Sequence, residues 1–381
     1  MNSQIKLFQP LTIKSVTLPN RIVISPMCQY SANDGFLDAW HFVHLGRFSL
    51  GGAGLIFTEA TAVQKSGRIT HGCPGLWCDS QIAGHAQITS FALRNGSIPA
   101  LQLGHAGRKS GMQRPWFGNS FLNEEDFLRG DMPWQSIGPS PIAVDQGWPV
   151  PCEMNQAEIE IFVCDFVAAT KRALQAGYKV LEIHGAHGYL IHSFLSPLSN
   201  QRKDDYGGSL ENRMRLATDL AKQVRAAWPR NLPLFFRISS VDGISNGWSI
   251  QDSVVLANRL KGIGVDVIDC SSGGIAESAT ASISAKRQPG FQVPYAAQVK
   301  AKTGMKTMTV GLITDAAQAE EILNDGSADL IAIGREALTN PNWPLHAAQA
   351  LFGSENFENW PKQSGWWLER RTETCDVYRP I

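Results

Sequence analysis

The segment Lys179-Val180-Leu181-Glu182-Ile183 is a short, mostly apolar run between two segments of helical periodicity, residues 156–175 and 209–228. A run of this length is typical of a strand buried on both faces of a parallel sheet. The second helical segment opens on Ser209-x-x-Asn212, a spacing that suits a helix cap. Helix, buried strand and helix in succession predict one βα unit of an α/β fold.

Similar runs recur along the chain, and most are followed by glycine or serine and then by a helical pattern. The eight runs are residues 21–25, 54–58, 99–103, 179–183, 233–238, 266–270, 307–310 and 329–333. The helix expected after the fifth run covers residues 250–262 and ends at a glycine. Eight such units favour a closed (β/α)8 TIM barrel over an open sheet. No G-x-G-x-x-G follows the first run, which argues against a Rossmann fold.

Composition narrows the class of protein. The 381 residues are 43% hydrophobic and 18% charged, which allows a large core and argues against disorder. The formal net charge is zero and the pI is near 7.1, so neither a nucleic acid nor an anionic membrane is an expected partner. Since a neutral surface does little to oppose self-association, we expect a homodimer or homotetramer.

The first residues lack the charged-then-apolar pattern of a signal peptide, and no apolar run approaches the ~18 residues of a membrane span. The seven cysteines include no C-x-x-C pair, which speaks against a disulfide framework and against a zinc or iron–sulfur site. We therefore expect a cytoplasmic protein of one domain, residues 1–381. Residues 107–155, rich in Pro, Trp, Phe and Gly, are too long for a plain loop and predict a lid over one mouth of the barrel.

Polar residues and glycines gather where the predicted strands end, which is where TIM-barrel enzymes carry their chemistry. The segments concerned are residues 26–30, 58–60, 102–105, 184–189, 271–274, 311 and 334–335. A lone histidine is usually structural, but His184, His187 and Tyr189 at one strand end favour a functional interpretation. Arg237, near the end of a buried strand, needs an anionic partner, whereas Cys28 alone can simply pack as a small apolar side chain.

Glycines follow the last two predicted strands. Gly311 and Gly334 can merely make tight turns. Barrels, however, commonly bind phosphate at this place through backbone N–H groups, and Arg335 directly after Gly334 adds a matching positive charge.

The motifs together resemble the old yellow enzyme family, in particular its thermophilic-like, xenobiotic-reductase branch. The most specific match is His184-Gly185-Ala186-His187-Gly188-Tyr189-Leu190, and the match continues as far as Asn212-Arg213. Ser25–Tyr30 and Gln102–Arg108 also match, and the resemblance covers almost the whole chain. No C-x-x-C cluster motif is present, so the related 2,4-dienoyl-CoA reductases, which carry an iron–sulfur cluster, are set aside.

The resemblance implies FMN held non-covalently at the barrel mouth, with NADPH or NADH as hydride donor. It implies that Arg237 stabilises the negative charge of the reduced flavin. The flavin ring would be lined by Pro26, Met27, Cys28, Ala60 and Gln102, and the phosphate held by Gly311, Gly334 and Arg335, with Ser272 or Gly273 contributing.

The resemblance further implies an ene-reductase that reduces activated C=C bonds of enones, maleimides and nitroalkenes in a ping-pong cycle. His184 and His187 would donate hydrogen bonds to the substrate oxygen. Tyr189 would deliver a proton to the α-carbon, a task that solvent could also perform. Cys28 would tune the flavin and touch the substrate, and Tyr30 would shape the pocket.

The tail, residues 361–381, contains Trp366 and Trp367, which the resemblance places near substrate; ordinary packing is the alternative. Two other functions are alternatives for the whole chain. One is a metal-dependent barrel hydrolase with His184 and His187 as ligands, and the other is a non-catalytic flavin-binding protein. The physiological alkene and the choice between NADPH and NADH are not readable from these motifs.

Overall fold

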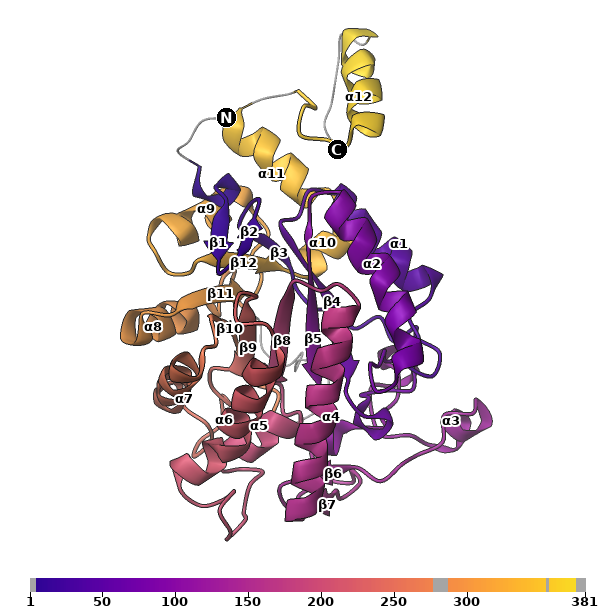
Figure 1. Ribbon diagram of the computed structural model, residues 1–381, viewed down its shortest axis with the longest axis vertical. Coiled ribbons are helices and arrows are strands. Elements are labelled where there is room, and N and C mark those ends of the chain that lie inside the picture. Colours follow the sequence, from indigo (N-terminus) through magenta and orange to yellow (C-terminus); the bar gives the residue numbers. More distant parts are fainter. Residues whose placement is uncertain (1–4, 277–286, 354–355, 375–381) are drawn as a thin grey trace.

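The structure is a computed structural model that describes residues 5–276, 287–353 and 356–374. Its centre is a closed barrel of eight parallel strands in the order β3-β4-β5-β8-β9-β10-β11-β12, which confirms the predicted TIM barrel (Figure 1). The strands are β3 (Ile22–Ile24), β4 (Leu55–Ala62), β5 (Ile98–Gly104), β8 (Val180–Gly185), β9 (Leu234–Ser239), β10 (Val267–Ser271), β11 (Lys306–Val310) and β12 (Leu330–Ile333).

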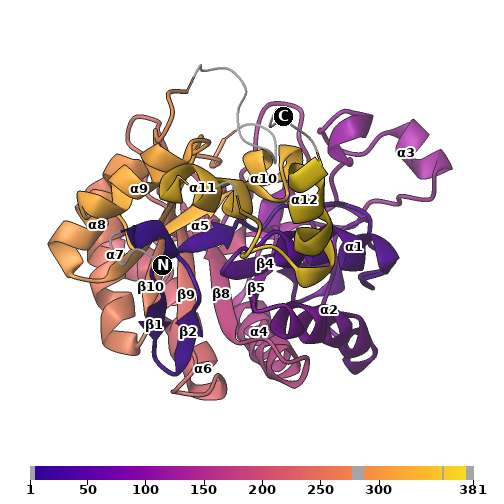
Figure 2. The same cartoon turned by 90° about the horizontal axis from the view of Figure 1, so that it is seen from above.

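Helices surround the barrel on its outer side, as the view from above shows (Figure 2). They are α1 (Ala39–Leu50), α2 (Ile82–Arg94), α4 (Gln156–Gln175), α5 (Leu190–Leu195), α6 (Leu210–Ala227), α7 (Ile250–Ile263), α8 (Val293–Thr303), α9 (Ala316–Asn324), α10 (Arg335–Thr339) and α11 (Trp343–Phe352). Short 3-10 helices are η1 (Lys6–Phe8), η2 (Lys65–Gly67), η3 (Asp79–Gln81), η4 (Gly107–Lys109) and η5 (Pro115–Phe117). No helix among the described residues is long and apolar enough to cross a membrane.

Side chains that cap the backbone set the helix boundaries. The Ser209 side chain accepts a hydrogen bond from the Asn212 N–H and starts α6, as predicted from its spacing. Asn155 and Glu158 form a reciprocal capping box at the start of α4. The end of α7 was predicted at Gly262, but the residue that closes this helix is Gly264, whose φ of 102° suits glycine.

An N-terminal hairpin closes the end of the barrel at which the strands begin. Its strands, β1 (Leu11–Ile13) and β2 (Val16–Leu18), pair antiparallel. Leu18 is buried in the same apolar cluster as Val23, Leu55 and Phe57, which fill the barrel interior at this end. This packing leaves the opposite end, where the strands finish, for a ligand.

The long segment after β5 carries the small elements α3 (Glu124–Leu128), β6 (Ile137–Gly138) and β7 (Cys152–Glu153). In Figure 1, β6 and β7 lie at the end of the barrel where α5 also lies, and β6 contacts both α5 and η4. Residues 107–155 therefore sit beside the end at which the strands finish.

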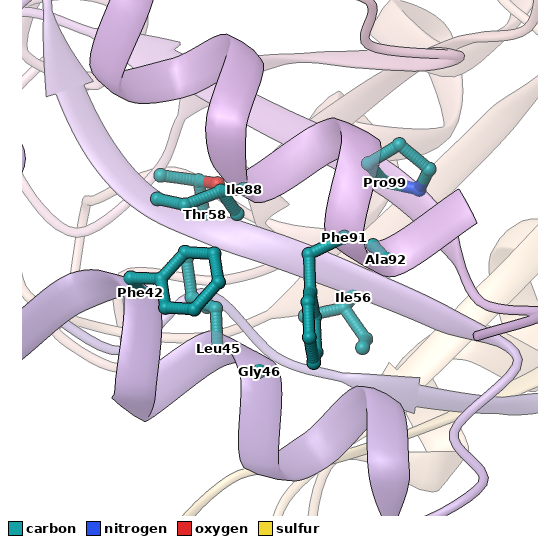
Figure 3. Close-up of a pocket in the computed structure, with 9 residues that line it drawn as sticks. All are labelled: Phe42, Leu45, Gly46, Ile56, Thr58, Ile88, Phe91, Ala92 and Pro99. Atoms are coloured by element: carbon teal, nitrogen blue, oxygen red, sulfur yellow. The ribbon is translucent and has the colours of Figure 1, made fainter. Parts of the chain in front are cut away.

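A small apolar cavity lies between α1 and α2 and the strands β4 and β5 (Figure 3). Phe42, Leu45 and Phe91 contribute to its walls, and its volume is about 10 Å³. Its polar residue, Thr58, is already hydrogen-bonded to the Tyr178 hydroxyl at 2.9 Å. A space of this size holds about one water, so we regard it as a packing gap.

Candidate active site

Two histidines and a tyrosine meet directly after β8. The ring centroids of His184 and His187 are 5.2 Å apart, and the Tyr189 ring lies 5.1 Å from His184 and 6.4 Å from His187. The chain turns sharply here because His187 and Gly188 have φ angles of 60° and 73°. The turn brings side chains three and five residues apart onto one side of the strand end.

Contacts from the next two strands hold this turn. The His187 N–H donates to the Ser239 hydroxyl oxygen at 2.9 Å, and His187 Nε2 lies 2.7 Å from Ser271 Oγ. Lys109 Nζ donates to the backbone oxygens of His187, at 3.0 Å, and of Gly274. The position of the turn is therefore fixed by β9, β10 and η4 together.

Both histidines are neutral at neutral pH. Burial, followed by the positive charge of Arg237, lowers the pKa of His184 and of His187 well below the usual value. A neutral imidazole carries one N–H, so each ring can donate one hydrogen bond to an oxygen. Burial, followed by Cys28, raises the pKa of Tyr189 well above its usual value, so this phenol keeps its proton.

Cys28 follows β3 and lies in the same region as Tyr189 and Tyr30. Burial, followed by the nearby Glu59, raises the pKa of the Cys28 thiol well above its usual value. The thiolate is the reactive form of cysteine, so Cys28 is poorly suited to act as a nucleophile. Glu59 accepts a hydrogen bond from the Gln29 N–H at 2.8 Å, while burial raises the Glu59 pKa to about 8.

The other residues expected to line the flavin ring lie on or directly after neighbouring strands. Pro26 and Met27 are half-buried in the segment after β3, and Ala60 lines a small cavity together with His184 and Tyr189. Tyr30 is buried, with a φ of 50°, and its ring lies 6.0 Å from the Trp116 ring of the long segment.

The floor of the site is polar. Gln102 on β5 donates through Nε2 to Glu182 Oε1 at 2.8 Å, and Arg237 on β9 pairs through Nη1 with Asp269 Oδ2 at 2.9 Å. Arg237 Nη1 also lies 3.3 Å from Ser25 Oγ. The partner that the sequence required for Arg237 is thus Asp269, a residue that the sequence argument did not single out.

Among the buried polar atoms near this floor that have no hydrogen-bond partner among the described residues are Arg237 Nε and His184 Nδ1. A buried donor without a partner is costly, and a ligand with acceptor atoms would satisfy it. The N–H of Arg237 suits a carbonyl or anionic edge such as that of a flavin ring.

The other end of a ligand would meet the turns after the last two strands. A side chain at Gly311, where φ is 123°, would place its Cβ 2.8 Å from the Phe291 ring and 2.9 Å from Gln292 Nε2. Gly334 precedes α10, and the Arg335 side chain beside it is exposed. Ser272 donates through Oγ to Gln292 Oε1 at 2.7 Å, and the Gly273 oxygen accepts from Ser239 Oγ at 2.7 Å. The crowding and the positive φ both favour glycine at position 311.

The C-terminal helix α12 (Lys362–Thr374) does not reach this site. In Figure 1 it lies beyond α11, at the end of the barrel that the hairpin closes, whereas α5, β6 and β7 mark the opposite end. Trp366 and Trp367 stack edge to face at 4.6 Å and remain 49% and 68% exposed. The two tryptophans thus lie away from the strand-end site of their own chain, because the chain returns to the far end after β12.

A metal site finds no support here. Among residues 5–276, 287–353 and 356–374, no group of three or more His, Cys, Asp or Glu side chains is arranged to hold a metal ion. His105, the histidine that follows β5, accepts a hydrogen bond from the Gly107 N–H at 2.9 Å and packs against Phe162.

Residues 6–352 match the NADH:flavin oxidoreductase / NADH oxidase family. The chain belongs to this family. Among its relatives is the NADPH dehydrogenase of Geobacillus thermodenitrificans (strain NG80-2), which is 42% identical over 347 residues, covering 91% of this chain and 94% of the relative. These matches make the protein an FMN-dependent NAD(P)H oxidoreductase of the old yellow enzyme family.

Solved structures share the barrel. The old yellow enzyme homologue from Zymomonas mobilis superposes with a TM-score of 0.74 at 24% identity, covering 93% of this chain and 96% of that one. A 2-naphthoyl-CoA reductase complex superposes with a TM-score of 0.81 at 23% identity. That match covers 92% of the oxidoreductase described here but 52% of the reductase chain, so the present chain spans about half of that structure.

Proposed function

We propose that this oxidoreductase is an ene-reductase that reduces activated C=C bonds, such as those of enones, maleimides and nitroalkenes, by a ping-pong cycle. The observation that carries the proposal is the buried cluster of two neutral histidines and a protonated tyrosine at the end of β8. Neutral N–H donors polarise a carbonyl or nitro oxygen without first taking up a proton.

The FMN site would lie across the mouth of the barrel. Arg237 would face the edge of the ring where negative charge develops on reduction, and its unpaired Nε supports that role. The residues proposed to line the ring are Pro26, Met27, Cys28, Ala60 and Gln102, and those proposed to hold the phosphate are Gly311, Gly334 and Arg335, with Ser272 and Gly273 beside them.

When bound, FMN supplies hydride chemistry, accepting a hydride from NAD(P)H and returning one to the substrate. His184 and His187 bind the substrate oxygen and orient the alkene. Tyr189 holds a proton over the α-carbon, and because burial raises its pKa, it releases this proton only to a strongly basic carbon. Cys28 as a thiol and Tyr30 shape the pocket.

Two larger features belong to the same proposal. Residues 107–155 contribute Trp116 and Trp148 beside Tyr30 and the Tyr189 cluster, which supports their role as a lid. We also propose that the protein forms a homodimer or homotetramer. The tail tryptophans could then approach substrate only in a neighbouring subunit, since α12 lies far from its own site.

The test is an anaerobic visible-absorbance titration of the purified protein, first with NADPH and then with 2-cyclohexenone. Bleaching of the flavin by NADPH and its return with the enone would establish both half-reactions. Bleaching without return by enone, maleimide or nitroalkene would show a flavin reductase with other acceptors and overturn the ene-reductase assignment.

A further inference from the structure

Two carboxyl groups lie in the barrel interior below the candidate site and have no role in the mechanism above. Glu182 on β8 and Asp269 on β10 are both fully buried. Taking a carboxylate out of water is costly unless a positive charge or several donors compensate it. The floor offers one guanidinium, Arg237, for the two acids.

Each acid holds one of the side chains proposed to contact the flavin. Glu182 Oε1 accepts from Gln102 Nε2 at 2.8 Å, and these residues are direct neighbours in the β5–β8 pairing. Asp269 Oδ2 pairs with Arg237 Nη1 at 2.9 Å, and these residues are neighbours in the β10–β9 pairing. The two acids and their partners therefore come from four strands of the floor, β5, β8, β9 and β10.

The remaining carboxyl oxygens indicate that one of the two acids is protonated. Glu182 Oε2 and both carboxyl oxygens of Asp269 have no hydrogen-bond donor among the described residues, since the contact of Asp269 with Arg237 is an ion pair. The two carboxyl groups lie close enough for each to influence the pKa of the other. Two ionised oxygens in that position would repel, whereas a proton on one of them turns the contact into a hydrogen bond.

The neighbours place this proton on Glu182. Burial, followed by the charge of Asp269, raises the pKa of Glu182 well above its usual value. Arg237 pairs directly with Asp269 and favours its ionised form, opposing the effect of burial on that group. One guanidinium, one carboxylate and one neutral acid then give a floor with no net charge.

We propose that Glu182 is a positioning residue that keeps its proton in the working enzyme and donates it to Asp269, so that Arg237 faces the flavin with a single counter-ion. The consequence rests on the proposed placement of FMN over Arg237. A second ionised carboxylate below the ring would disfavour the negative charge of the reduced flavin, so the retained proton keeps the reduction potential high enough for NAD(P)H to reduce the cofactor.

The first test compares the flavin midpoint potentials of the wild type, E182Q, D269N and the double variant at neutral pH. If Glu182 is neutral, E182Q changes no charge and its potential stays close to that of the wild type. The double variant leaves Arg237 without a counter-ion and should have the highest potential. D269N should fall between, because Glu182 can then ionise in place of Asp269. A rise in E182Q as large as that in the double variant would show that Glu182 is ionised and overturn the proposal.

The second test does not depend on bound flavin. In wild-type protein with ¹³C-labelled glutamate carboxyls, infrared spectra at neutral pH should show a carboxylic-acid C=O band that shifts in D₂O. The band should persist after FMN removal and in E59Q, which removes the contribution of the other buried glutamate, and it should be absent from the double variant E59Q/E182Q. A wild type without the band would refute the retained proton.

The two tests also separate this inference from the proposed function. If the band is present but all four potentials coincide, the acid pair does not act on the flavin, and its role as a positioning residue falls. A failed turnover of enones would leave both the band and the order of potentials unaffected.

Discussion

At the scale of single residues, burial decides the chemistry of the site more than residue type does. His184 and His187 stay neutral because burial and Arg237 both disfavour a further positive charge. Cys28 stays a thiol because burial, and after it the nearby Glu59, raises its pKa. Each group is therefore held in the form that donates hydrogen bonds, which suits binding of an electron-rich oxygen.

Replacing both histidines by alanine, H184A/H187A, should remove the substrate anchor while leaving the flavin bound. Binding of a phenolate, followed through its long-wavelength absorbance with the flavin, should weaken at least roughly 100-fold, because two hydrogen bonds to a charged oxygen, each about 1.5–3 kcal/mol, are lost. H346A, which changes a histidine on α11, is the matched control and should bind normally. Normal turnover of 2-cyclohexenone by the double variant would contradict the anchor role.

Arg237→Met should slow reduction of the flavin by NADPH and lower its midpoint potential, because the positive charge that stabilises the reduced ring is removed. Stopped-flow absorbance measures the rate, and a dye-coupled titration measures the potential. R259M removes an exposed arginine that pairs with Glu211, and serves as control. An unchanged potential in R237M would remove Arg237 from this role.

At the scale of elements, the sequence predicted what depends on local pattern. All eight strands occur near the predicted residues, and α4 covers the predicted residues 156–175. β4 is longer than the predicted 54–58 because a register shift between Thr58 and Thr61 lets the strand continue past Glu59. The hairpin β1–β2 was not predicted, since each strand has three residues and is stabilised by contacts distant in sequence.

The hairpin should contribute measurably to stability. Leu18→Ala removes a side chain that is 1% exposed and packs into the end of the barrel that the hairpin closes. The free energy of unfolding should therefore fall by about 2–5 kcal/mol. Urea denaturation followed by far-UV circular dichroism provides the measurement. L128A, at a leucine that is 89% exposed on α3, should change stability little. Equal losses in the two variants would show that the hairpin does not stabilise the barrel.

At the scale of the whole molecule, the site follows from one rule, that TIM-barrel enzymes carry their functional residues where the strands end. From the sequence alone it predicts His184, Tyr189, Cys28 and Arg237 at one end of a barrel. Glu182 and Asp269 were not predicted as site residues, because each lies inside an otherwise apolar run. A charged residue in a buried strand was nevertheless the feature that singled out Arg237. The side on which the tail lies could not be predicted, because it depends on how α11 packs.

The stability of the whole chain should depend on pH through Glu59. Its pKa is about 8 in the folded state, above the usual 4.5, so between these values the folded state holds a proton that the unfolded state has lost. Stability from this group is full below the unfolded pKa and is lost as pH rises through about 8. E59Q should flatten the decline in melting temperature over this range. A decline as steep in E59Q as in the wild type would place its origin elsewhere.

The end of the barrel that the hairpin closes has a practical consequence. The backbone N–H groups of Lys6 and Leu7 donate to the Glu320 carboxylate at 2.9 and 2.8 Å, on the side of the hairpin and away from the mouth. An anchor attached at this side, such as a resin, an electrode surface or a fused cofactor-recycling enzyme, would leave the mouth facing the surrounding liquid. Immobilised in that orientation, the catalyst should exchange substrate and product as freely as it does in free solution.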